Sequence, residues 1–124
     1  MTPVKTIRED LLAILALSGI EKISFDNMEA GEIERAIIIS EFSLEYQDRQ
    51  LDMTYYRGLT VTAQLVAKTA EDLDEMVDSL AEIDNQSSGS VLHAMVQRVV
   101  YETDDSPDYK IAIATISAEI VDYE

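Results

Sequence analysis

The stretch YYRGLTVTAQLVAKTAEDLDEMVDSL (residues 55–80) changes its hydrophobic period halfway along. Over the first half, apolar and polar residues alternate, which is typical of a strand with one buried face. Thr69 then offers a helix N-cap, and the carboxylates that follow it complement the helix dipole. From there the apolar residues recur at helical spacing and predict an inward stripe of Leu73, Met76, Val77, Leu80 and Ile83.

The N-terminal residues predict another helix, which Gly19 ends in the left-handed conformation. Two starts are open for this helix. One is a capping box of Thr6 and Glu9, and the other is an earlier start after Thr2 with Pro3 at the first helical position. The buried face is expected to hold Val4, Ile7, Leu11, Ile14 and Leu15.

Two segments before residue 55 predict strands. KISF (residues 22–25) is short, whereas RAIIISEFSLEY (residues 35–46) is long and rich in β-branched residues. A polar connection, residues 47–54, joins the long strand to the strand of the opening stretch as an antiparallel hairpin. Alternation is expected to place on one face of the long strand Ala36, Ile38, Phe42, Leu44 and Tyr46.

The last third of the chain predicts two strands around the turn DDSPD (residues 104–108). The first of these strands, residues 91–100, also fits helical spacing, so a helical turn before it is an alternative. The element order is then α-β-β-β-α-β-β. This order predicts one α+β domain over residues 1–124, in which two helices pack on one face of a mainly antiparallel sheet.

The final strand contains a change of phase. Ile111 and Ile113 share one face of an ideal strand, whereas Ile116 and Ile120 share the other. Such a change predicts a bulge or bend near residues 114–115.

Composition narrows the function classes. The chain has no cysteine, which excludes disulfides, thiolate zinc sites and cysteine nucleophiles. Charges interrupt the N-terminus before any apolar run, and the longest apolar run is LLAILAL, so we expect a soluble protein with no leader and no membrane partner. The net charge of −16 maintains solubility and repels phosphate backbones, which argues against specific nucleic-acid binding.

The sequence offers no catalytic, metal or cofactor site. Read as a calcium loop from Asp72, the acidic helix has Met76 at the fifth position and Ile83 at the twelfth, where ligands are required. The only histidine, His93, is expected to be a hydrogen-bonded surface or edge residue. No phosphate-binding loop or nucleophile motif is present. We therefore predict no enzyme activity, no metal and no cofactor.

Tyrosines and arginines, which are enriched in protein interfaces, mark a candidate contact surface. If identical subunits meet, Arg49 or Arg57 is expected to pair with acids of a neighbouring copy, because so few positive charges oppose so many negative ones. The alternative for either adjacent tyrosine is that it packs against one end of the sheet. The whole candidate set is Arg49, Tyr55, Tyr56, Arg57, Asp104, Asp105 and Tyr109.

The order of features resembles the tail terminator proteins of long-tailed bacteriophages, the lambda-like minor tail protein family. The matching features are the helix TIREDLLAILAL, the strand RAIIISEFSLEY, a polar loop and the strand LTVTAQLVAK. They continue with the acidic helix AEDLDEMVDSL, the strand pair around YETDDSPDYK and a last strand ending in AEIVDYE. The polar connection at residues 47–54 occupies the place of the family's long strand-to-strand loop, which contacts neighbouring proteins, but here it is short.

The resemblance implies a viral structural protein of the virion tail, assembled in the cytoplasm of a bacterial host. It implies a homo-oligomeric, hexameric ring that caps the tube of the major tail tube protein, stops its polymerisation and meets the head–tail connector protein. DNA passes through such a ring without specific binding. A neck or connector-completion protein, or a small α+β module that binds a ligand or a protein, are the alternatives. We expect the carboxylates of residues 69–85 to face outward rather than a DNA channel.

Overall fold

The structure is a computed structural model and describes residues 2–20, 22–25, 35–46, 54–102 and 109–123. Short 3₁₀ turns, Ala16–Ser18 and Leu80–Glu82, extend its two helices. The elements are α1 (Val4–Leu15), β1 (Ile23–Ser24), β2 (Arg35–Tyr46), β3 (Thr54–Ala67), α2 (Ala70–Ser79), β4 (Gln86–Ser88), β5 (Val91–Tyr101) and β6 (Lys110–Tyr123).

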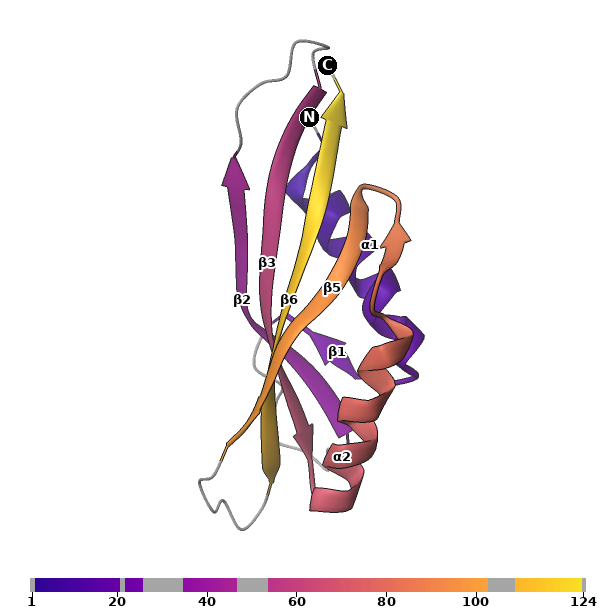
Figure 1. Cartoon of the computed structure of the whole chain (residues 1–124), viewed down its shortest axis with the longest axis vertical. Helices are drawn as coiled ribbons and strands as arrows, with labels where there is room; N and C mark the ends of the chain where they lie inside the picture. Colours follow the sequence, from indigo (N-terminus) through magenta and orange to yellow (C-terminus); the bar gives the residue numbers. More distant parts are fainter. Residues whose placement is uncertain (1, 21, 26–34, 47–53, 103–108, 124) are drawn as a thin grey trace.

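Within these residues the strands form one sheet in the order β1-β2-β3-β6-β5-β4. β1 runs parallel to β2, and all other neighbours are antiparallel. Both helices pack on one face: α1 lies beside β4 and β5, and α2 beside β3, β6 and β2 (Figure 1). The predicted α+β class and element order are confirmed, with one addition. The addition is the short strand β4, in the segment NQSSGS (residues 85–90) that follows the second helix.

α1 starts earlier than a capping box at Thr6 would allow. Pro3 precedes the first helical residue, and its carbonyl accepts a hydrogen bond from the Ile7 amide at 3.1 Å. The early start is therefore confirmed, but Pro3 occupies the N-cap and not the first helical position. Val4 is 41% exposed, so the prediction of its burial is wrong: the buried stripe begins one turn later, with Ile7, Leu11, Ile14 and Leu15. Gly19 has φ +82°, as predicted.

α2 confirms the interpretation of the acidic stretch as an amphipathic helix. The Thr69 hydroxyl accepts a hydrogen bond from the Asp72 amide at 3.1 Å and caps the first turn. Leu73, Met76, Leu80 and Ile83 are buried against the sheet, and Val77 is half-buried. The carboxylates on the other side are exposed, at Glu71, Asp74, Glu75, Asp78 and Glu82.

β2 contains a bulge that its alternating pattern concealed. Ile39 pairs with Ala63 and Glu41 with Thr62, so Ser40 is an extra residue in the ladder. Because the bulge reverses the parity, Ile38 faces away from the helices, together with Ala36, and the prediction that they share a face with Phe42 is wrong. The residues of β2 that do face the helix layer are Ile37, Ile39, Phe42, Leu44 and Tyr46.

β6 is regular, so the bulge predicted near residues 114–115 is wrong. Its register with β3 is continuous from Lys110 to Tyr123, and its even-numbered residues from Ala112 to Ile120 are buried. Ile111 and Ile113 belong to the opposite face of the sheet. The irregularities lie in β5 instead, at two register shifts between residues 92 and 95 and between residues 96 and 98. β5 is extended from Val91, which rules out the alternative of a helical turn there.

Candidate interaction surface

The helices leave one face of the sheet to solvent over much of its area. We call this side the open face; its middle is polar and half-exposed, with Thr62, Gln64, Thr115 and Ser117. Glu41 and Glu45 extend the open face onto β2, and Glu119 lies on β6. A polar sheet face of this kind suits contact with water or with another hydrated surface.

Both edges of the sheet are only partly covered by strands in the described part of the chain. β1 pairs with Ile37 and Ile38 alone, so no strand lies beside residues 41–46 of β2. β4 pairs with β5 only between Val91 and Ala94, so no strand lies beside residues 98–101. Such edges present backbone N–H and C=O groups that another chain can pair with.

Arg57 lies inside the chain. It is on the helix-facing side of β3 and only 2% exposed. Its guanidinium donates a hydrogen bond to the backbone carbonyl of Thr2 at 2.8 Å, and its Cζ lies 5.7 Å from the centre of the Tyr46 ring. This guanidinium therefore joins the segment before α1 to β3 and to the end of β2.

The other predicted interface residues do not form one cluster with Arg57. Tyr55 and Tyr56 belong to the same strand, opposite Asp122 and Val121 of β6. Tyr109 is half-buried and precedes Lys110, which pairs with Ala67 at the far end of β3. Three members of the set, Arg49, Asp104 and Asp105, lie outside the described residues.

Exposed apolar side chains at the sheet edges were missed by sequence reasoning. Tyr46 is 66% exposed at the end of β2, and Met95, Val100 and Tyr101 on β5 are 41–49% exposed. Alternation predicts which face of a strand is apolar, but it does not show which strand has no neighbour. The strand order supplies that information, because an edge strand leaves one flank of its apolar side chains uncovered.

The acidic helix is held to β2 by an ion pair. Arg35 Nη2 lies 2.7 Å from Asp72 Oδ1 and also binds Glu75 Oε2. The hydrogen bond from Arg35 holds the pKa of Asp72 below its usual value. Between these two carboxylates in the sequence, Asp74 Oδ1 accepts a hydrogen bond from the Tyr101 hydroxyl at 3.0 Å. Both contacts orient α2, and they engage some of its carboxylates within the chain.

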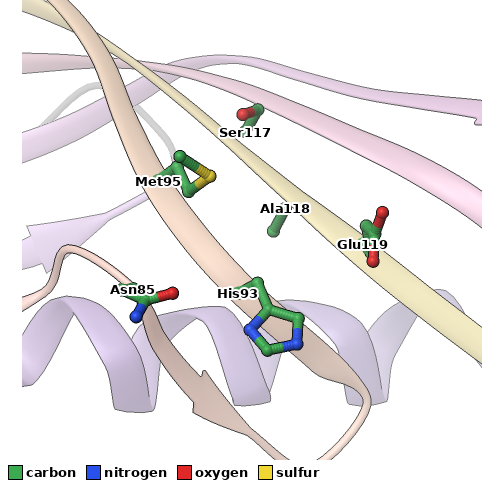
Figure 2. Close-up of a pocket in the computed structure, with 6 residues that line it drawn as sticks. All are labelled: Asn85, His93, Met95, Ser117, Ala118 and Glu119. Atoms are coloured by element: carbon green, nitrogen blue, oxygen red, sulfur yellow. The ribbon is translucent and has the colours of Figure 1, made fainter.

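A shallow hollow of about 430 Å³ lies where the first bulge of β5 faces β6. Its lining side chains spread along the hollow rather than converge on one point (Figure 2), and they are Asn85, His93, Met95, Ser117, Ala118 and Glu119. His93 is exposed in a left-handed conformation, φ +53°, and its amide donates to the Ser87 hydroxyl at 2.9 Å. The bulge thus accounts for the position of His93.

The described residues contain no group of three or more histidine, aspartate or glutamate side chains that could hold a metal ion. None of the helices in the same residues is long and apolar enough to cross a bilayer. Partly uncovered edges, a polar sheet face and exposed carboxylates are features of the described residues that another molecule can contact.

The sequence matches no protein-family model. It also has no significant match among curated proteins. Among solved structures, a chain of the "Virion of native gene transfer agent (GTA) particle" has a similar structure, with a TM-score of 0.65. The similarity covers 96% of this chain and 91% of that chain, at 7% sequence identity. At this identity the similarity demonstrates a shared fold.

Proposed function

We propose that this chain is a structural protein of a phage-like virion and acts as a tail terminator. In this role identical copies form a hexameric ring on the end of the tail tube, stop the polymerisation of the major tail tube protein and present a surface to the head–tail connector protein. The observation that carries the proposal is the fold shared with a gene transfer agent virion chain over nearly the full length of both chains.

The surface is suited to such a ring. A head-to-tail ring uses two different surfaces of each copy, and among the described residues the sheet has two different edges that strands cover only in part. Carboxylates on the open face, at Glu41, Glu45 and Glu119, contribute negative charge to that face in a chain of net charge −16. Since DNA phosphates are repelled by such a surface, DNA can move through the ring without being retained.

Electron microscopy of tail tube protein, assembled with and without this chain, tests the proposal. We expect tubes of controlled length that carry a ring at one end only when the chain is present. Tubes of the same uncontrolled length in both samples would contradict termination. Rings that bind the connector protein and leave tube length unchanged would instead assign the chain to neck completion.

Arg49, which lies outside the described residues, is the other candidate for an ion pair between neighbouring copies. Arg57 was proposed for the same role, but its hydrogen bond to Thr2 makes Arg57→Glu a test of folding as well. We therefore expect Arg49→Glu to weaken the oligomer in light scattering, while Lys68→Glu, the same charge change at an exposed site after β3, leaves it intact. An unchanged oligomer in Arg49→Glu excludes this residue from the contact.

A further inference from the structure

The uncovered parts of the two sheet edges are regular strands. Residues 41–46, here called the β2 edge run, pair with β3 in an unbroken register on one side. Residues 98–101, the β5 edge run, pair with β6 in an unbroken register in the same way. Each run follows directly after a bulge, and within the described chain each has no strand on its other side. Each can therefore accept one more antiparallel strand.

We propose that the β5 edge run of one copy pairs with the β2 edge run of the next copy, so that the sheets of neighbouring copies join into one. The inference rests on the proposed ring and names the surfaces that build it. The occupant of each edge is a second copy of this chain.

Strand directions favour this pairing. Because β2, β3, β6 and β5 are successive antiparallel neighbours, β2 and β5 run in opposite directions. Rotation about an axis near the strand direction preserves these directions, so the edge of β2 meets the edge of the neighbour's β5 as an antiparallel pair. This geometry gives straight ladder hydrogen bonds, and it is heterologous, as a closed ring requires.

Charges on the open face are complementary across the proposed junction. Arg98 projects from the β5 edge run, and no carboxylate of the described chain lies within 4 Å of it. Glu41 and Glu45 project from the β2 edge run on the same face and are exposed. Opposite charges on facing strands stabilise the pair, and few cations are available elsewhere in a chain with 9 basic and 25 acidic residues.

Apolar side chains are complementary on the helix side. The β2 edge run places Phe42, Leu44 and Tyr46 there, and the β5 edge run places Val99 and Tyr101. Tyr46 is 66% exposed and Tyr101 is 46% exposed in the single chain. Cross-strand aromatic and β-branched contacts are among the most stabilising pairs in sheets, so joining the runs would bury side chains that the single chain leaves open.

The covered parts of the edges set the register. Val99 is level with Ile39 across the sheet, through Ala114 and Ala63, so the β5 edge run lies level with the part of β2 that β1 covers. To reach residues 41–46, the neighbouring copy must shift along the strands. When a sheet closes on itself, its strands tilt by roughly 35–45° against the axis of closure, and this tilt requires a stagger of the same kind between neighbouring strands. β1 and β4 would thereby prevent unstaggered stacking.

Disulfide trapping tests the junction directly, since the chain has no cysteine of its own. Val100→Cys on the open face of the β5 edge run is combined in turn with Glu41→Cys, Ser43→Cys or Glu45→Cys on the β2 edge run. Facing residues of an antiparallel pair have α-carbons about 4.5–5.5 Å apart, within the range that a disulfide spans. We expect oxidation to produce a ladder of covalent multimers, fastest for one of the three partners.

Two matched samples show whether the contact is head to tail. Ser43→Cys mixed with Val100→Cys, each on its own chain, should give a cross-linked dimer containing both variants and no ladder. Val100→Cys combined with Glu82→Cys, an exposed site on the helix side, should give no ladder. A ladder no stronger than that of the Glu82→Cys control overturns the proposal.

Charge reversal provides a second measurement. Arg98→Glu should reduce the rate of cross-linking between residues 43 and 100 several-fold, and Glu45→Arg in the same chain should restore it. Lys68→Glu changes the charge equally and should have no effect. Equal rates in all these variants contradict the ionic part of the junction.

Experiments can contradict tail termination and edge pairing independently of each other. Rings that cap tail tubes without any disulfide ladder would overturn edge pairing and leave tail termination standing. A ladder from a chain that does not affect tube length would overturn tail termination and leave edge pairing standing.

Discussion

The carboxylate of Asp10, in the middle of α1, accepts two hydrogen bonds from Ser90, one from its amide at 2.9 Å and one from its hydroxyl at 2.6 Å. Gly89, the residue before Ser90, lies so close that a β-carbon on it would be 2.6 Å from Asp10 Oδ2. The turn between β4 and β5 is therefore fastened to α1 by a contact that only glycine permits. This contact secures the end of the sheet where β4 covers β5.

We predict that Gly89→Ala destabilises the fold by about 1–3 kcal/mol, because φ is +53° and the new β-carbon collides with Asp10. Gly19→Ala is the matched control: its φ is +82°, but a β-carbon there meets no atom within 4 Å, so its cost should be smaller. Urea unfolding measures both. In a double-mutant cycle, Asp10→Ala should reduce the cost of Gly89→Ala. Equal costs at the two glycines would show that the contact is unimportant.

Arg57→Met should lower the free energy of unfolding by about 1.5–3 kcal/mol, because it removes a buried charged donor from the Thr2 carbonyl and keeps only the aliphatic stem. Arg57→Lys should recover part of the loss, since lysine retains the charge without the planar fork. Arg98→Met, at an exposed edge, should change the stability of the monomer by no more than about 0.5 kcal/mol. Similar losses for Arg57→Met and Arg98→Met would contradict the assigned role of Arg57.

The ion pair between Arg35 and Asp72 should make stability depend on pH in acid. The folded-state pKa of Asp72 is lowered from 3.8, so the stabilisation is complete above that value and is lost as pH falls through the lower folded pKa. We expect Arg35→Gln to lower the Tm near neutral pH and low salt. The difference from the parent chain should shrink below pH 3.8 and in concentrated salt, because the pair is exposed. A difference that is constant with pH would exclude a charge effect.

Ala114→Leu should destabilise the fold by about 1–3 kcal/mol, because Ala114 is fully buried on the helix side of β6 and extra methylenes in a packed core force neighbouring side chains to shift. Thr115→Leu, at the next residue but on the open face, should alter stability by only about 0.5 kcal/mol. Thermal unfolding followed by circular dichroism compares the two. A larger loss of stability for Thr115→Leu than for Ala114→Leu would contradict the packing of the helices on the Ala114 side of β6.

Sequence reasoning was successful where structure depends on neighbouring residues along the chain. Helical spacing predicted the buried stripe of α2, and Thr69 and Gly19 act at the helix ends as expected. Alternation predicted the hairpin of β2 and β3, whose register confirms it. These features follow from periods of two and 3.6 residues, which belong to the local backbone geometry.

Sequence reasoning failed where the burial of a residue depends on which helices or strands pack against its own strand. Alternating isoleucines in β6 suggested a phase change, yet the buried positions there include the alanines Ala112, Ala114 and Ala118. Small residues are buried where helices approach closely, and hydrophobic patterning underestimates them. The real change of phase, at Ser40 in β2, depends on pairing with β3 and leaves the apolar pattern of β2 looking continuous.

The sequence by itself determined the two helices, the strands other than β4 and their order along the chain, because these depend on neighbouring residues. It also determined the negative charge and the lack of cysteine chemistry, which follow from composition. Only the tertiary structure decided which strands are edges, that Arg57 is buried against Thr2, and that Arg98 lies on the same face as Glu41 and Glu45. Strand order and register arise from contacts between residues far apart in the chain. Those contacts make β2 and β5 edge strands in the described part of the sheet, and they place opposite charges on the same face of the two edge runs.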